Sequence, residues 1–188
     1  MLNLYRLIEL LVTLQSIIIS TMLPVYIPLP FIGKTGTSYE IPITWQIPTV
    51  IVLILLFNSK VVFKAFTIYI ILGLFLFPVF PQGGSIGYLL TPNFGYLLGI
   101  FPLIKIIDNL NKYKINTRKF LFNGILAITS MHITGIIYNL IQIIYYREFN
   151  VFLYNLGRYS TGKIGYHIIM LIPIMLLIKP INNLKYKK

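Results

Sequence analysis

The chain has 188 residues, of which 57% are hydrophobic and 11% are charged, and its mean hydropathy is +0.82. A soluble domain of this length carries ~25% charged residues. The composition therefore excludes a soluble domain and indicates an integral membrane protein. The net charge of +12 comes from cations between hydrophobic segments and near the C-terminus. Such cations are typical of residues that set membrane topology, and without a nucleic-acid motif they do not predict nucleic-acid binding.

Six segments approach the ~20 apolar residues that a membrane-spanning helix needs. We therefore predict an all-α fold, a bundle of six transmembrane helices that forms one domain over residues 1–188. The six predicted helices cover residues 4–23, 44–57, 61–80, 92–107, 119–146 and 162–178. The first is predicted to be retained, because no signal-peptide cleavage site follows it. Residues 24–40 and 147–162 are predicted to be loops, the second with room for a short amphipathic turn at residues 151–156.

The distribution of lysine and arginine predicts the orientation of these helices. With the N-terminus inside, four of the 16 cations lie outside, namely Lys34, Arg147, Arg158 and Lys163, and the other 16 − 4 = 12 lie inside. Positive residues concentrate on the cytoplasmic side. We therefore predict a multi-pass protein of the cell membrane with both termini in the cytoplasm.

An uncharged, glycine-rich segment at residues 81–102 separates the third predicted helix from the fourth. In the predicted topology it begins as an extracytoplasmic loop. Its glycines allow close backbone approach, and its neutral polar and aromatic side chains can hydrogen-bond and stack. We expect the segment to fold back on the protein and contact a ligand, through Gln82, Gly84, Ser85, Tyr88, Asn93 and Tyr96.

A polar stripe runs along the fifth predicted helix. Gly135, Asn139 and Gln142 follow His132 by three, seven and ten residues, which places all four on one face. Interhelical hydrogen bonding is one interpretation, although it contributes only ~0.6 kcal/mol per pair. We favour a ligand cradle, because the stripe is aligned and includes a glycine. Gln46, at the start of the second helix, either faces the same site or lies at the interface.

Small polar residues also repeat along the first predicted helix, at Ser16 and Ser20. Small residues at this spacing let helices approach closely in lipid. Either they pack within the chain, or they form a docking face for another membrane subunit.

Signatures of enzymatic chemistry are missing, and we predict that the chain is not an enzyme. The four carboxylates are scattered through the sequence, and no hydrolase, zinc-protease or phosphate-loop motif is present. A zinc site would need more ligands than His132 and His167. No metal or cofactor is expected, and any energy for transport must come from a partner that hydrolyses ATP.

Residues 83–100, GGSIGYLLTPNFGYLLGI, resemble the pattern GGxGxLxxPxxGYLxGF of the BioY family. Ile41–Gln46 is similar to the VPITxQ run that opens the family's second helix. BioY proteins are the biotin-binding S components of energy-coupling-factor (ECF) vitamin importers. The resemblance implies a substrate-binding subunit that contacts membrane lipid, a transmembrane coupling subunit and ATPase subunits. It also implies that Ser16 and Ser20 replace a pair of docking alanines, and that Tyr138 is a ligand-binding aromatic.

One departure from the family leaves the ligand open. Many BioY proteins carry PGDLxK on the sixth helix, and here Met175 and Ile178 take the places of its Asp and Lys. Either His132, Asn139 and Gln142 replace that contact, or affinity for biotin is lower, or the ligand is another vitamin. A membrane scaffold or assembly subunit that transports nothing is the alternative outside this class.

Overall fold

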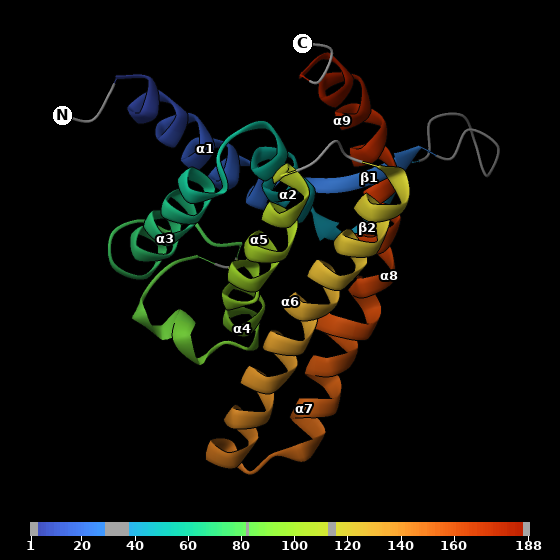
Figure 1. The fold of residues 1–188 in the computed structure, drawn as a ribbon. Helices are drawn as coiled ribbons and strands as arrows, with labels where there is room; N and C mark the ends of the chain where they lie inside the picture. The colour runs from blue at the N-terminus through green and yellow to red at the C-terminus, as the bar shows by residue number, and fades with distance from the viewer. Residues whose placement is uncertain (1–3, 29–37, 82, 113–115, 186–188) are drawn as a thin grey trace.

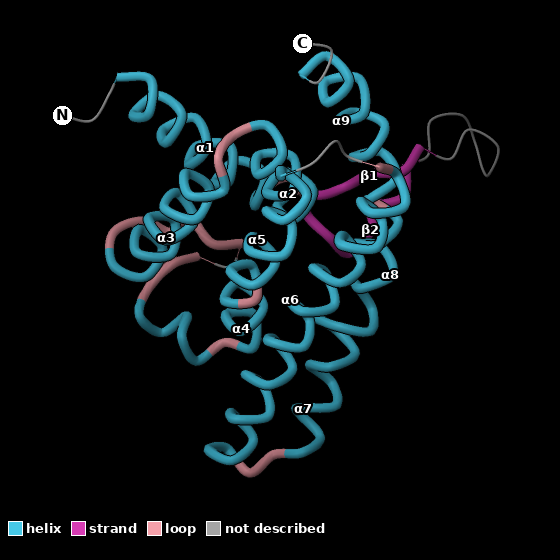
Figure 2. The backbone as a smooth tube through the Cα atoms, viewed as in Figure 1, coloured by secondary structure: helices cyan, strands magenta, loops and turns pink. Residues whose placement is uncertain are grey.

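The computed structural model describes residues 4–28, 38–81, 83–112 and 116–185. The fold is mostly helical, with one small sheet (Figures 1 and 2). The first helices are α1 (Leu4–Met22), α2 (Gln46–Leu56), α3 (Ser59–Phe75), α4 (Pro92–Leu98) and α5 (Ile100–Asp108). The remaining helices are α6 (Thr117–Tyr146), α7 (Phe149–Asn155), α8 (Gly162–Ile169) and α9 (Leu171–Lys185), and the strands are β1 (Pro24–Pro28) and β2 (Ser38–Thr44).

Local sequence signals set several of these helix boundaries. The side chains of Asn58 and Asn116 accept hydrogen bonds from the backbone N–H groups of Lys60 and Arg118, at 2.9 and 3.0 Å, and so cap α3 and α6. Pro92 begins α4, where its missing N–H costs nothing. Helices α4 and α5, which meet at Gly99, occupy the predicted fourth helix.

The predicted loop at residues 24–40 is wrong in part, because its ends form an antiparallel hairpin. Val25 pairs with Ile41, and both are buried together with Ile43 and Met170. Alternating β-branched residues on β2 place one face of the strand against the protein. The prolines end α1, as predicted, but they also fit the ends of a short strand. Strand β2 then leads directly into α2.

The predicted loop at residues 147–162 is also wrong, except that the short amphipathic turn expected at residues 151–156 overlaps α7. Helix α7 is followed by a π-helical turn over Leu156–Thr161, which continues into α8. The glycines and polar residues of this region are typical of a loop, and the π-turn accommodates them inside a helical run. Helix α7, the π-helical turn, α8 and α9 follow one another and form a long helical segment beside α6, here called the C-terminal arm (Figure 1). The predicted sixth helix covers only part of this arm.

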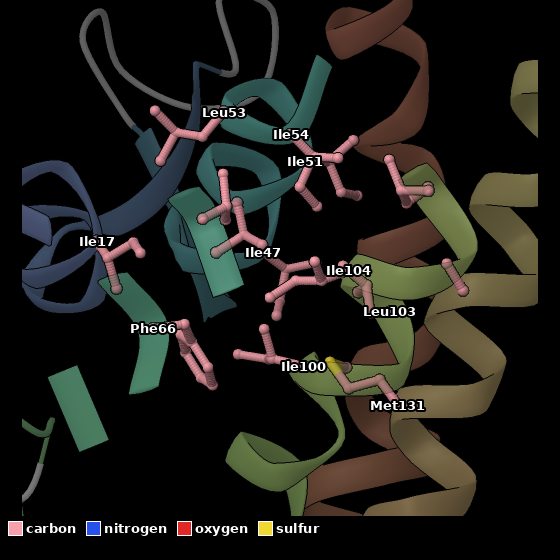
Figure 3. Packing of buried hydrophobic residues seen from close by; sticks show 14 of the residues in the cluster. Ile17, Ile47, Ile51, Leu53, Ile54, Phe66, Ile100, Leu103, Ile104 and Met131 are labelled. Carbon is pink, nitrogen blue, oxygen red and sulfur yellow. The ribbon is translucent and has the colours of Figure 1, made fainter. Parts of the chain in front are cut away.

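Helix α6 is the longest, as predicted, and it packs against α4, α5, α7, α8 and α9, whereas α1 packs on α2 and α3. The core between them contains Ile17 of α1, Ile51 of α2, Phe66 of α3, Leu103 of α5 and Met131 of α6 (Figure 3). Within the described residues, three helical runs are long and apolar enough to cross a membrane: Leu4–Met22, Thr117–Ile144 and Phe149–Ile181.

Helices α4 and α6 meet through a reciprocal pair of aromatic–glycine contacts. The ring of Tyr96 on α4 lies over Gly135 of α6, and Tyr138 of α6 lies over Gly95 of α4. A Cβ atom on Gly135 would lie 2.6 Å from Cγ of Tyr96, closer than real atoms approach. The absence of a side chain at both glycines therefore sets the spacing of the two helices.

Candidate ligand-binding site

A cavity of about 170 Å³ lies where the end of β2, the start of α2, helix α4, the middle of α6 and the π-turn with α8 converge. Its wall is part apolar, with Ile47, Leu97 and Met131 among the lining residues. Its polar and aromatic lining residues are Thr44, Gln46, Asn93, Tyr96, His132, Arg158, Tyr159, Lys163 and His167. A cavity that combines an apolar wall with a few convergent polar groups is typical of a small-molecule site.

Two buried polar atoms at this cavity form no hydrogen bond of normal geometry within the described part of the chain, although the side chains of Tyr69 and Ser160 lie near them. The two atoms are Nε2 of Gln46 and the hydroxyl of Tyr96, on side chains that are 7% exposed each. The hydrogen bond from the Trp45 N–H to the carbonyl of Leu23, at 3.0 Å, fixes the junction that carries Gln46. An unpaired buried polar group costs about 1–3 kcal/mol, and a bound ligand can remove that cost.

A buried relay of three side chains connects α6 to the C-terminal arm. Nδ1 of His132 lies 3.1 Å from Oγ of Ser160, and its Nε2 lies 3.1 Å from Nδ1 of His167. His132 is 1% exposed. In the contact between the two imidazoles one ring donates and the other accepts, so the tautomer of each histidine depends on the other. The relay holds both rings rigidly at the cavity wall.

Two cations flank one aromatic ring at the same cavity. Nζ of Lys163 lies 5.4 Å from the ring centroid of Tyr159, and Cζ of Arg158 lies 5.7 Å from it. These distances are those of cation–π contacts. Arg158 also donates a hydrogen bond to the Tyr154 hydroxyl at 2.8 Å. Among the described residues that line the cavity there is no carboxylate.

The structure brings together four of the ten predicted ligand-binding residues, Gln46, Asn93, Tyr96 and His132. Two more lie directly behind them. The hydroxyl of Tyr88 accepts a hydrogen bond from Nδ2 of Asn93 at 2.7 Å, and the hydroxyl of Tyr138 donates to the carbonyl of Leu89. Tyr88 and Tyr138 therefore position the glycine-rich segment and α4 without lining the cavity themselves.

Three of the other predicted residues line other hollows, and the roles of all the others stay predictions. Gly84 and Ser85 line a separate hollow beside the end of α3, and Asn139 lines another between α6 and α7. Gln82 lies outside the described residues. On α1, Ser16 is half-buried, whereas Ser20 is 4% exposed and donates to the carbonyl of Ile17. The burial of Ser20 within this chain favours internal packing over a docking face at that position.

Sequence reasoning missed five residues of the C-terminal arm at or behind the cavity, because it treated most of their segment as a loop. They are Arg158, Tyr159, Ser160, Lys163 and His167. Met175 and Ile178, the positions aligned with the family's ligand-binding pair, pack with the hydrophobic core instead. The signal that could have found Lys163 is a cation in an otherwise apolar helical run, since such a residue often marks a functional site.

The apolar helices and the buried polar cavity define a helical membrane protein with a small-molecule site. A model of the BioY family matches residues 3–174, and the chain belongs to this family. The predicted family is thus confirmed. BioY proteins are transport subunits, which also confirms the prediction that the chain is not an enzyme.

Individual proteins are similar to the chain over different lengths. It is 41% identical over 73 residues to "Probable biotin transporter BioY" of Lysinibacillus sphaericus, and this match spans 39% of the chain and a third (33%) of that relative. A crystal structure of "the S-component for biotin from an ECF-type ABC transporter" has the same fold, with a TM-score of 0.63 and 17% sequence identity. That similarity covers 97% of the chain and 95% of the solved one.

Proposed function

We propose that the chain is the substrate-binding membrane subunit, or S component, of an ECF-type importer, and that its substrate is biotin. The observation that carries this proposal is the cavity in which Gln46, Asn93, Tyr96 and His132 converge. Membership of the BioY family and the fold of a biotin S component support it.

The chemistry of the cavity suits the neutral, ring-shaped end of biotin. The ureido group carries one carbonyl acceptor and two N–H donors. Gln46 offers an Nε2 donor that forms no hydrogen bond of normal geometry in the described residues, and the Tyr96 hydroxyl can donate or accept. The rings of Tyr96 and Tyr159, whose centroids are 6.0 Å apart, and the apolar wall suit the thiophane ring and the aliphatic chain.

The topology of six spans with cytoplasmic termini belongs to the same proposal. The helices α2 and α3, and the pair α4–α5, would supply three spans beside the three long apolar runs. The split of 12 inner and four outer cations supports this orientation. We propose one domain over residues 1–188 that contacts lipid and docks a transmembrane coupling subunit, with ATPase subunits beneath it. Ser16, on α1, would lie in the docking face.

Ligand binding by the purified chain tests the proposal. A ligand that binds only the native state stabilises it by RT ln(1 + [L]/Kd), which is about 2.7 kcal/mol at 100-fold excess over Kd. Biotin is therefore expected to raise the thermal unfolding temperature of the protein in detergent. Tyr26→Phe, an exposed position on β1, serves as a matched control variant and should respond to biotin like the wild type. No response of the wild type to biotin would overturn the substrate assignment.

A further inference from the structure

Two cations at the cavity, Arg158 and Lys163, bear on the charge of the ligand. Lys163 is half-buried on α8 and Arg158 is exposed at the π-turn, and the cationic groups of both lie within about 6 Å of the ring centroid of Tyr159. Both residues line the cavity. Three successive residues of the π-turn face this region. Arg158 and Tyr159 line the cavity, and Ser160 contacts His132 of the relay.

Among the described residues, no carboxylate lines the cavity to neutralise this pair. The four carboxylates of the chain are Glu9, Glu40, Asp108 and Glu148, and none of them lines it. A partly buried cation without a counter-charge is costly, and contact with an aromatic ring offsets only part of that cost. Arg158 uses one donor on Tyr154 and retains others, whereas an ammonium such as that of Lys163 has three donors.

We infer that Arg158 and Lys163 form an anion-binding subsite of the cavity and hold the carboxylate of the ligand. The inference rests on the proposed function and adds the charge of the substrate to it. The neutral ring of the ligand contacts Gln46 and Tyr96, and the aliphatic chain passes along the apolar wall. The half-buried Lys163 contributes more than the exposed Arg158, because a charged hydrogen bond strengthens as water is excluded.

Isothermal titration of the purified full chain with biotin and with biotinamide tests the inference. Biotinamide keeps the ring and chain of biotin but replaces its carboxylate with a neutral amide. A hydrogen bond to a charged group gives roughly 10- to 100-fold in affinity. Biotin should therefore bind the wild type at least ~10-fold more tightly than biotinamide. Lys163→Met should remove most of that difference by weakening biotin and leaving biotinamide within about twofold, since only a charged partner is lost.

Three further variants separate charge from packing. Lys163→Arg keeps the cation and should retain the preference for biotin, and Arg158→Met should reduce the preference less than Lys163→Met does. Lys179→Met removes an exposed cation of α9 that lies outside the cavity, and it should change neither affinity. Retained binding of biotinamide by each variant shows that the variant is folded.

The outcomes distinguish this inference from the proposed function. Equal affinity of the wild type for biotin and biotinamide would overturn the anion-binding subsite and leave the biotin assignment standing. An equal loss of both ligands in Lys163→Met would also overturn it, because the residue would then act on the fold. Binding of neither ligand to the wild type would refute the biotin assignment itself, and the inference with it.

Discussion

Replacing Gly135 by alanine tests whether the α4–α6 contact builds the ligand site. The added Cβ would overlap the ring of Tyr96, with Cγ at 2.6 Å, so the ring or the whole of α4 must move. Overpacking of this kind costs about 1–3 kcal/mol. An alanine in a helix otherwise gains roughly 0.5–1 kcal/mol over glycine. Because the overlap involves a buried ring on a packed helix, we expect net destabilisation.

Gly165→Ala is the matched control. Gly165 lies inside α8, and a Cβ there would meet nothing within 4 Å. The same chemical change should therefore stabilise the protein at position 165 and destabilise it at position 135. In a chain of this size, each kcal/mol changes the unfolding temperature by about 2–4 °C. Thermal unfolding of the two variants in one detergent measures both changes.

A double-mutant cycle assigns the effect to the ring. In a Tyr96→Ala background the space over Gly135 is open, so Gly135→Ala should lose its penalty. The single variant should also bind biotin more weakly, because the displaced ring carries the Tyr96 hydroxyl away from the cavity. Changes of the same sign at positions 135 and 165, or a penalty that persists without the Tyr96 ring, would refute this account.

His132→Leu should abolish biotin binding while the fold persists, because it removes the middle member of the relay; normal binding by a folded variant would assign His132 to packing. Gly84→Val should lower the unfolding temperature, since its Cβ would lie 2.7 Å from the carbonyl oxygen of Phe77; an unchanged melting curve would contradict this. Ser16→Leu should block co-purification with a coupling subunit and spare biotin binding, and the reverse pattern would move Ser16 into the bundle. Reporters fused after Lys188 and inserted after Gly87 should report opposite sides of the membrane, and the same side would overturn the topology.

The helices were predictable where apolar length and caps agree. The predicted first helix ends one residue after α1 ends, and the predicted fifth helix begins two residues after α6 begins. The hairpin was not predictable, because its apolar residues alternate over only three positions on β2, and because prolines stand at both ends of β1 and inside β2. Its partner strand lies beyond residues 29–37, and nothing local in the sequence specifies that pairing.

The site was predictable where local pattern and packing coincide, as at Asn93, Tyr96 and His132. Asn139 shares the helical stripe with His132, but seven residues along α6 carry it about 10 Å farther, at ~1.5 Å per residue. It therefore lines a different hollow. The two cations at the cavity, Arg158 and Lys163, escaped prediction because most of their segment was predicted to be a loop, whereas it forms a π-turn that leads into α8.

The π-turn at Leu156–Thr161 has a consequence for how specificity in such a protein can change. A π-turn is an α-helix with one residue inserted, and each residue of a helix advances by about 100°. Deleting one residue there would rotate Arg158 and Tyr159 relative to α8 while α9 keeps its packing on the core. A single-codon insertion or deletion could thus exchange one set of cavity-facing side chains for another. The position at which the helix tolerates an irregular turn is also the position at which substrate preference can change without rebuilding the bundle.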